Sequence, residues 1–443
     1  MFKKPPDWKK ALNNPKDLAM LITSKELQAL VKKANVEYLH WDKFRYQPLP
    51  KNIAPEAAWA LVKLARLTNR ENISVRDELN NPFSIFLTKE HMKCLSFIDS
   101  YTSGTIVTGE SMPDEASKER LVINGLIEEA ISSSQIEGAN TTRKIAKNMI
   151  EQHLKPKNKS EQMIFNNYLA MTQLEDWKKR DLTDGFLLEL HKILTVETLD
   201  QKEDEGRFRN DDDEVMVVES LTGNIAHVPP KIKEAKKQLE QLYKFINVDD
   251  EENYIHPFVK ASILHFLIGY IHPFVDGNGR LARAAFYWYL VRKNYWMFKF
   301  LPISLQIKKQ DWKAGYYRAF KYVESDEGDI TYFLSYKLTL AKNAIEDFIA
   351  YLKKKQKEEN LLKEKLSSSQ EINNRQLDLI SLLQKNPTLE IDLQAYKLRH
   401  HIAYETARSD LTELETKSIL RKVKKGKKYL FTKGNRFPFV EKK

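Results

Sequence analysis

The sequence has a single cysteine and no long apolar run. Cys94 is that cysteine among 443 residues, which excludes an internal disulfide and a cysteine-rich zinc site. No stretch approaches the roughly 18 uninterrupted apolar residues of a transmembrane helix. The first residues, MFKKPPDWKKALNN, are basic but lack the apolar segment of a secretory signal. We therefore expect a cytoplasmic protein with no membrane partner.

The rest of the composition is typical of a globular protein with buried cores. Hydrophobic residues make up 42% of the chain and charged residues 30%. A chain of this length exceeds the usual single domain, so two or three domains are expected. The net charge is +11, and residues 374–443 hold 16 Lys and Arg against 8 Asp and Glu, a difference of +8. This basic tail permits nucleic-acid binding without showing it.

Helical patterns dominate the chain, so the predicted fold class is mainly α. Residues 1–110 are predicted to form helices joined by loops. A sharper pattern predicts a helix from about 113 to 138, where Gly138 is a natural C-terminal stop. The only convincing strand signal lies at 214–228, where two β-branched runs flank the turn Thr222-Gly223-Asn224. We predict a β-hairpin there and helices again to about residue 355.

The segment His272–Arg283, HPFVDGNGRLAR, combines several groups that phosphate chemistry needs. An apolar helix at 258–271 delivers His272, and Pro273 forbids its continuation. His272 can accept a hydroxyl proton at neutral pH, because an ordinary histidine titrates near pH 6.5. Gly277 and Gly279 allow the backbone to approach a ligand closely.

Cations and a carboxylate surround the same loop. A new helix is predicted from Asn278, and its N-terminal amides attract phosphate oxygens. Arg280 and Arg283 lie three residues apart on the first turns, so both can reach one polyphosphate. Asp276 supplies the oxygen ligand that Mg²⁺ prefers. A dozen consecutive residues with complementary roles make a purely structural loop a poor explanation.

This segment resembles the signature of the Fic family, HPFx(D/E)GN(G/K)RxxR, and fills every defined position. The resemblance extends over roughly residues 36–350. It implies an all-α enzyme that transfers AMP from ATP to a Ser, Thr or Tyr hydroxyl of a target protein and releases pyrophosphate. By the same resemblance, the expected roles are as follows: His272 is the base, Asp276 binds Mg²⁺, Gly277, Asn278, Gly279 and Arg280 hold the α- and β-phosphates, and Arg283 holds the γ-phosphate. Gly279 favours AMP transfer, since the related Doc-type kinases carry lysine there.

Two further segments fit the family. The hairpin at 214–228 matches its flap, which pairs with the backbone of the target protein. The segment SSSQIEG matches the inhibitory pattern (S/T)xxxE(G/N), with Ser133, Glu137 and Gly138 at the fixed positions. The resemblance therefore implies an N-terminal inhibitory helix whose Glu137 pairs with Arg283 and misaligns ATP. A structural hairpin and a capped helix end are the alternatives for these two segments.

The basic tail resembles a winged helix-turn-helix. AYETARSDLTELE (403–415) would be the recognition helix, and the strands around Lys425-Gly426 would form a basic wing. Tyr404, Thr406 and Arg408 could meet a DNA groove. The acidic residues of the same helix favour protein docking or dimerisation instead: Glu405, Asp410, Glu413 and Glu415.

We thus expect an N-terminal helical region (1–110), a Fic core (111–355), a charged linker (356–370) and a winged helix (371–443). The leading function is autoinhibited, Mg²⁺- and ATP-dependent protein adenylylation, with auto-modification. Transfer of another nucleotide and removal of AMP from a target stay open as alternatives. A DNA-binding regulator that senses nucleotide is the rival of another class, although a sensor needs no base such as His272. The target protein and the choice between monomer and homodimer stay open.

Overall fold

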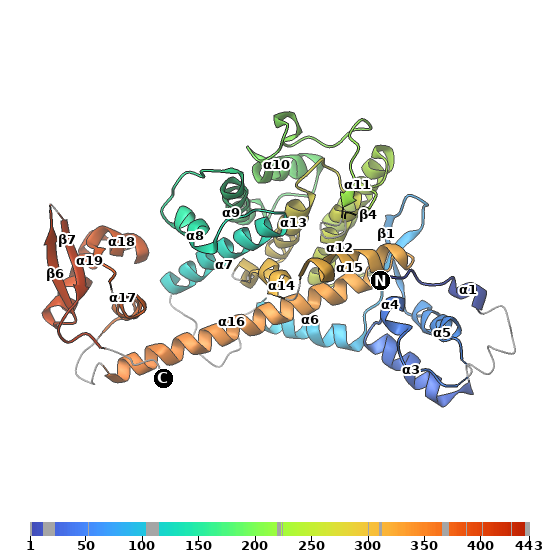
Figure 1. The fold of residues 1–443 in the computed structure, drawn as a ribbon, viewed down its shortest axis with the longest axis horizontal. Helices are drawn as coiled ribbons and strands as arrows, with labels where there is room; N and C mark the ends of the chain where they lie inside the picture. Colours follow the sequence, from blue (N-terminus) through green and yellow to red (C-terminus); the bar gives the residue numbers. More distant parts are fainter. Residues whose placement is uncertain are drawn as a thin grey trace. The chain divides into compact units, whose positions relative to one another are not determined.

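A computed structural model confirms that the chain is mainly helical (Figure 1). It describes residues 2–11, 23–51, 53–102, 115–218, 223, 225–299, 301–309, 312–365, 372–386, 388–400, 402–426 and 428–438. The chain divides into two units, which are described separately: residues 1–112 with 121–345, and residues 113–120 with 346–443. Among the described residues, no helix combines the length and apolar character that crossing a bilayer requires.

The N-terminal part of the larger unit contains helices and one β-hairpin. Its helices are α1 (Trp8–Ala11), α3 (Lys25–Val36), α4 (Trp41–Phe44), α5 (Pro55–Leu67) and α6 (Lys89–Thr102). The aromatic connector after α3 packs on α5, because the rings of Trp41 and Phe44 lie 5.9 and 5.5 Å from that of Trp59.

The expectation of helices and loops alone in this part is wrong. Strands β1 (Glu71–Arg76) and β2 (Pro82–Ile85) pair antiparallel, with Asn72 opposite Ser84. Burial alternates along β1 in the period of two that strands require. The turn is closed by Asp77, whose carboxylate accepts hydrogen bonds from the amides of residues 79 and 81. The strands are too short for their pattern to stand out in the sequence.

The remaining elements of the larger unit surround two central helices. They are α7 (Glu115–Ile136), α8 (Arg143–Glu151), α9 (Lys159–Trp177), α10 (Asp184–Thr195), β3 (Val217–Val218), β4 (Ile225–His227), α11 (Ile232–Asn247), α12 (Pro257–Ile271), α13 (Asn278–Arg292), α14 (Ile303–Lys309), α15 (Trp312–Ser325) and α16 (Thr331–Lys365), with single 3₁₀ turns at Lys202–Asp204 and Trp296–Lys299. The start predicted for α7, at 113–114, lies outside the described residues.

Helices α12 and α13 form the centre of this unit (Figure 1). Pro257 begins α12 at a position that needs no amide donor, and the His256 side chain accepts a hydrogen bond from the amide of Phe258. Both helices are buried on nearly every face, which explains why their sequences lack a continuous polar stripe. They therefore form a rigid base for the six residues that join them.

The predicted hairpin at 214–228 is present as β3 and β4. The strands pair antiparallel, with Val217 opposite His227. They are shorter than expected, and Thr222 and Asn224 of the predicted turn lie outside the described residues. Gly223 has a φ of 69°, a value that favours glycine.

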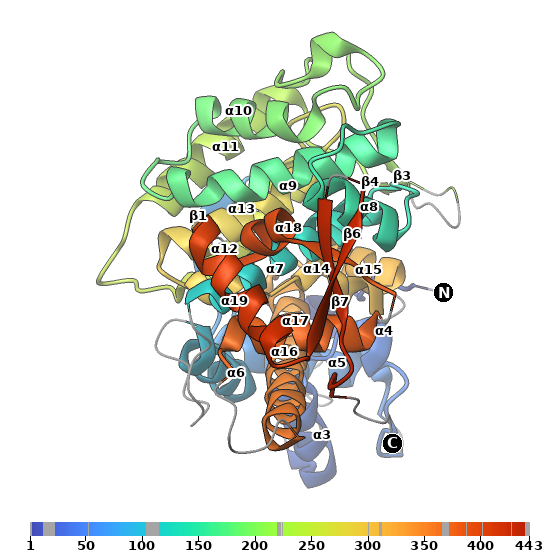
Figure 2. The same ribbon diagram turned by 90° about the vertical axis from the view of Figure 1, so that its left-hand side faces the viewer.

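Among its described residues, the smaller unit contains the second part of α16, three short helices and a three-stranded sheet (Figure 2). Its elements are α17 (Asn374–Lys385), β5 (Ile391–Asp392), α18 (Leu393–His400), α19 (Tyr404–Thr416), β6 (Leu420–Lys425) and β7 (Lys428–Lys433). The sheet order is β5-β7-β6, and all its pairs are antiparallel. This arrangement is consistent with the predicted winged helix, although β5 and α18 were not expected. Residues 356–365, within the predicted linker, continue α16 as helix.

A buried ion pair joins the N-terminal helices to the turn between α15 and α16. Lys63 of α5 lies 2.6 Å from the carboxylate of Asp326, and both side chains are almost fully buried. Tyr332 also donates to Asp326, and Arg66 donates to the Tyr332 hydroxyl. Such a pair is costly to break from one side, because the remaining charge stays buried without compensation.

We expect Lys63→Met to lower the unfolding free energy of the larger unit by about 3–5 kcal/mol. Adding Asp326→Asn should recover part of this loss, because the stranded carboxylate is then neutral. The control is Glu90→Gln, which breaks an exposed pair with Lys93 and should cost less than about 1 kcal/mol. Urea denaturation followed by tryptophan fluorescence measures all three variants. Equal losses for Lys63→Met and Glu90→Gln would contradict the importance of the buried pair.

Candidate active site

The loop between α12 and α13 begins at His272 in a left-handed conformation. Its φ is 51°, and its amide closes α12 by donating to Ile268 O. Left-handed geometry at a residue other than glycine stores strain of about 1–3 kcal/mol, so the surroundings must hold it. Arg209 does so, because its Nε donates to His272 O at 2.8 Å and its amide to Pro273 O at 2.9 Å.

The imidazole of His272 is held as a neutral base. Its Nδ1 lies 3.1 Å from Gly269 O, so that nitrogen carries the hydrogen and Nε2 carries the lone pair. Burial lowers the pKa of His272 to about 4; the bond to Gly269 opposes this shift, and the nearby cations His227 and Arg209 add to it. At neutral pH the ring is therefore able to accept a proton at Nε2.

Asn278 and His191 fix the rest of the loop. The Asn278 side chain accepts from the amide of Phe274 at 3.0 Å and donates to its carbonyl at 2.8 Å. His191 of α10 stacks on the Phe274 ring at 3.7 Å between centroids. Its Nε2 lies 2.8 Å from Asp276 O, and its Nδ1 accepts from the amide of Gly206. The loop is thus tied to two other segments of the chain.

Two glycines keep the loop open. Gly277 precedes α13 as its N-cap with a φ of 83°, and no side chain caps the helix. A Cβ on Gly277 would lie 2.7 Å from Thr195 Cγ2 and 3.1 Å from His191 Nε2. A Cβ on Gly279 would lie 2.2 Å from Glu137 Oε1. A side chain at Gly277 would strain the backbone, and one at Gly279 would displace the Glu137 carboxylate. The first amides of α13 are left for an anion.

Arg283 is paired with Glu137. Its Nη2 lies 2.8 Å from Glu137 Oε1, and its Nε donates to Ser133 Oγ at 2.7 Å. Burial disfavours the charge on Arg283, but the carboxylate of Glu137 outweighs it and raises the pKa. The ion pair expected from the resemblance is therefore present.

The end of α7 positions Glu137. Gly138 has a φ of 98°, and the amide of Ala139 closes the helix by donating to Ser134 O. Ser134 Oγ in turn donates to Met163 O of α9. The helix end therefore has its own fixed position against α9, independent of Arg283.

Asp276 and Arg280 have different surroundings. The Asp276 side chain is 64% exposed, and its Oδ2 lies 3.8 Å from Arg280 Nη2. Arg280 is buried and donates to Leu194 O at 2.9 Å, at the end of α10. Arg280 is thus also a structural link between α13 and α10, which its spacing from Arg283 did not indicate.

The site has a buried cationic group directed at the place where an anionic ligand would bind. Arg283 Nη1 is buried without a hydrogen-bond partner among the described residues, and it would lie 3.3 Å from a Cβ on Gly279. It therefore faces the uncapped start of α13. Asp276 is the exposed carboxylate of this loop, and no described group of three or more His, Cys, Asp or Glu forms a metal site. A Mg²⁺ ion would thus need ligands from phosphates and water besides Asp276, as Mg²⁺ commonly has.

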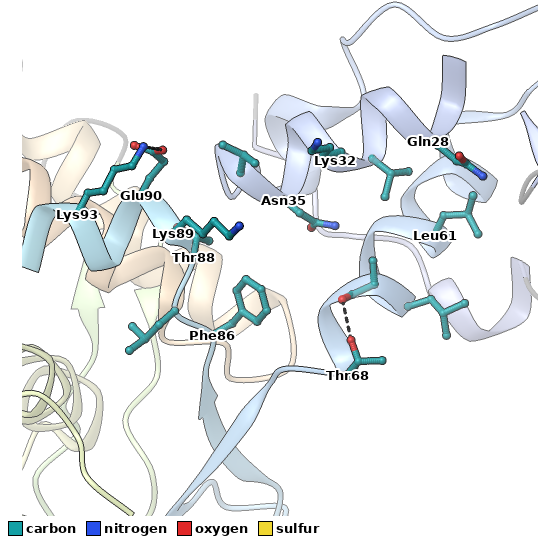
Figure 3. Close-up of a pocket in the computed structure, with 15 residues that line it drawn as sticks. Gln28, Lys32, Asn35, Leu61, Thr68, Phe86, Thr88, Lys89, Glu90 and Lys93 are labelled. Atoms are coloured by element: carbon teal, nitrogen blue, oxygen red, sulfur yellow. Dashed lines mark hydrogen bonds and ion pairs between the residues drawn. The ribbon is translucent and has the colours of Figure 1, made fainter. Parts of the chain in front are cut away.

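A large cavity lies elsewhere in the same unit (Figure 3). It measures about 800 Å³ and is bounded by α3, α5 and the start of α6. Its floor is apolar, with Val31, Leu61 and Phe86 among the lining residues. None of the predicted site residues lines it, so the cavity is separate from the His272 loop.

Comparisons with known proteins agree with the motif. The model of the Fic/DOC family matches residues 181–290. Residues 181–290 are therefore similar to a Fic domain. The protein adenylyltransferase Fic of Nematostella vectensis is 31% identical over 124 residues, which are 28% of this chain and 26% of that protein. The protein of the same name from Drosophila melanogaster is 29% identical over 159 residues, or 36% of this chain and 28% of its own length. This chain therefore covers only about a quarter of these relatives.

Solved structures support the fold. A Fic family protein from Desulfovibrio desulfuricans G20 has a TM-score of 0.51 and 19% identity, over 79% of this chain and 97% of that chain. A fragment of Fic-1 from C. elegans has a TM-score of 0.51 and 16% identity, over 75% and 86% of the two chains. At these identities the likeness concerns the fold alone.

Several residues that hold the site have no clear sequence signal. His191 and His265 are both fully buried on helices. His191 nevertheless supports the loop carrying Asp276 through its contacts with Phe274 and Gly206. Arg209, in the segment GRFR, clamps the loop at His272 O. A histidine or arginine that supports a loop 60 to 90 positions away can be identified only once the chain is folded.

Proposed function

We propose that the Fic domain is a protein adenylyltransferase that moves AMP from ATP to a Ser, Thr or Tyr hydroxyl of a target protein. The observation that carries this proposal is the neutral His272, with Nε2 available, beside the open start of α13. The printed name of the curated relatives supports the same activity.

The proposed reaction needs one proton acceptor and a cradle for phosphates. His272 Nε2 takes the proton of the acceptor hydroxyl, whose oxygen forms a bond to the α-phosphorus of ATP. The bond from the α-phosphorus to the oxygen bridging to the β-phosphate breaks, and pyrophosphate leaves. The start of α13, from Gly277 to Arg280, holds the α- and β-phosphates, and Arg283 holds the γ-phosphate.

Asp276 is proposed as the protein ligand of Mg²⁺. When bound, Mg²⁺ neutralises phosphate charge and orients the oxygens. The exposed carboxylate of Asp276 fits this role, because it reaches solvent next to the open helix start.

The flap is proposed to bind the target chain. Apolar side chains of the hairpin are about half exposed, including Val218 and Ile225. An edge with exposed backbone groups and apolar side chains is suited to adding a strand from another chain. The same edge can also accept a segment of this protein, which is the route to auto-modification.

Ser133 and Glu137 are proposed to inhibit the enzyme. Glu137 uses the cation that the γ-phosphate needs, and its Oε1 occupies the space above Gly279. ATP bound beside Glu137 therefore has its α-phosphorus out of line. Gly138 supports this role by ending α7 at the point where Glu137 faces Arg283.

The smaller unit is proposed to dock duplex DNA. Asp410, one of the acidic residues that favoured protein docking over DNA binding, is buried. Its Oδ2 accepts a hydrogen bond from Arg375 Nε at 2.8 Å. Glu413 accepts from Gln376 and Lys417 within the unit. Tyr404 is exposed on α19, and the hairpin of β6 and β7 carries exposed lysines. Lys425 and Lys428 pair with Glu390 and Asp392, but such surface pairs are weak and phosphates can replace them.

Deletion of residues 369–443 should abolish DNA binding and leave auto-labelling intact, because the proposed chemistry lies in the larger unit. Fluorescence anisotropy with duplex DNA measures binding, and its affinity should fall steeply with salt. Absence of binding in the full chain, or insensitivity to salt, would favour the protein-docking alternative. Loss of labelling on deletion would contradict the separation of the two functions.

We expect His272→Ala to lower AMP transfer by about 100- to 10,000-fold, which is the usual contribution of a general base. The parent is Glu137→Gly, so that activity is measurable, and labelled ATP reports transfer. Calorimetry should find ATP binding nearly unchanged, because the phosphates contact other residues. His153→Asn, an exposed histidine substitution, is the control and should label like the parent. Parent-level labelling by His272→Ala would contradict the assignment of the base.

We expect Glu137→Gly to raise auto-modification about tenfold or more. Removing a charge-assisted contact of about 1.5–3 kcal/mol frees Arg283 for the γ-phosphate. Adding Arg283→Ala should remove the gain, since that contact is then lost. Glu128→Gln, which breaks the pair between α7 and Arg143 of α8, should leave activity unchanged.

The opposite result would identify a different reaction. If Glu137→Gly removes AMP from a modified target less well than wild type, Glu137 positions a water for AMP removal. If both proteins bind ATP with equal transfer activity, SSSQIEG is only the end of a helix.

A further inference from the structure

The flap contains a histidine beside the catalytic loop. His227 is the last residue of β4, and its side chain is only 11% exposed. Its ring packs against that of Tyr270 of α12, with centroids 5.1 Å apart. Tyr270 precedes His272 by two residues, so His227 touches the helical turn that delivers the proposed base.

Both ring nitrogens of His227 face atoms that can only accept hydrogen bonds. Nε2 lies 2.7 Å from the carbonyl oxygen of Tyr270. Nδ1 lies 3.2 Å from the carboxylate oxygen Oε1 of Glu324, near the end of α15. A neutral imidazole has one N–H group and can satisfy only one of these acceptors. The two contacts together therefore require the imidazolium form.

The charges around His227 favour the same form. Glu324 faces the ring from α15, and Glu78 from the turn between β1 and β2 also acts on it. Tyr270 of α12 contacts the ring, and His272, which follows α12, interacts with it electrostatically. Burial alone would lower the pKa of His227, but the hydrogen bond and charge of Glu324 outweigh it and raise the pKa.

The pKa values of the two neighbouring histidines are thus shifted in opposite directions. His272 is neutral at physiological pH, with a pKa lowered to about 4 mainly by burial, and the positive charge of His227 contributes to this shift. Pairs of titratable groups whose environments drive their pKa values apart mark acid–base roles. His227 itself has no free lone pair to act as a base, so its role is to hold another group in place.

We propose that His227 is a positioning residue for AMP transfer: as an imidazolium it ties flap strand β4 to α12 and α15, and so sets where the flap presents the acceptor chain. The tie also places a fixed positive charge beside His272, which keeps the base neutral. This inference rests on the proposed function for its effect on transfer, whereas the tie itself does not depend on any activity.

The pH dependence follows from the raised pKa. A group whose pKa is higher in the folded state contributes stability that is complete below about pH 6.5 and is lost as pH rises through the folded value. Above that value the neutral ring loses the contact with either Tyr270 O or Glu324. We therefore expect the flap to loosen on the alkaline side, and transfer to fall with it.

The first experiment tests the tie without any turnover. NMR titration of the His227 ring in the full chain should give a pKa above 6.5. Glu324→Gln keeps the shape and a hydrogen-bond acceptor but removes the charge, so the pKa should fall by about one unit. Hydrogen-exchange protection of residues 225–228 should decrease over the same pH range. Glu56→Gln, an exposed carboxylate of α5, is the matched control and should change neither measurement.

The second experiment tests the role in transfer, with Glu137→Gly as the active parent. The parent should lose transfer activity as pH rises through the His227 pKa. Glu324→Gln should move this alkaline loss of activity about one pH unit lower. His227→Phe should remove the alkaline loss of activity and lower transfer at pH 7. His227→Lys keeps a cation and should move the loss of activity to higher pH. ATP binding should be equal in all variants.

The outcomes separate the two proposals. A ring pKa at or below 6.5 that Glu324→Gln leaves unchanged would overturn the tie. A raised pKa with identical pH profiles for the parent and His227→Phe would overturn the positioning role. Absence of transfer in the Glu137→Gly parent at every pH would contradict the proposed function instead, and the ring titration would still decide whether β4 is tied by an imidazolium.

Discussion

The six residues that join α12 to α13 cannot move freely, because both helices are buried on nearly every face. This constraint determines much of what surrounds the site. The loop has to turn within a fixed gap, so it uses a left-handed residue at His272 and a glycine of positive φ at 277. Arg209 and His191 then hold it from segments far away in the sequence. The loop backbone is therefore already held in its turn, although Glu137 still occupies the space above Gly279.

The part of the structure that could be predicted is the part encoded locally. The apolar run of α12, the proline that ends it and the glycines that follow all act within a few residues, and their geometry follows from backbone chemistry. The pairing of Glu137 with Arg283 is different, because 146 positions separate the two residues. No periodicity indicates such a contact, and it could be anticipated only through the family resemblance.

The parts that escaped prediction depend on distant partners. The hairpin of β1 and β2 has strands too short for their alternation to stand out in the sequence, and its turn is set by Asp77. Arg280 looked like a ligand for phosphate from its spacing, yet its guanidinium also contacts the end of α10. His227 has no distinguishing neighbours in sequence; its meaning comes from Tyr270 O and Glu324, which lie 43 and 97 positions away.

The contact between Gly279 and Glu137 has a consequence for how this chain can diverge. A Cβ at position 279 would overlap the Glu137 carboxylate at 2.2 Å, so a larger residue there expels the carboxylate from the site. A lysine at this position would therefore require the Glu137 carboxylate to move away from the pair seen here. A substitution of the glycine therefore displaces Glu137 from its pair with Arg283 in the same step, whereas loss of the glutamate first leaves room for a side chain at position 279. The order of these two substitutions matters, because a single Cβ atom at position 279 overlaps the Glu137 carboxylate.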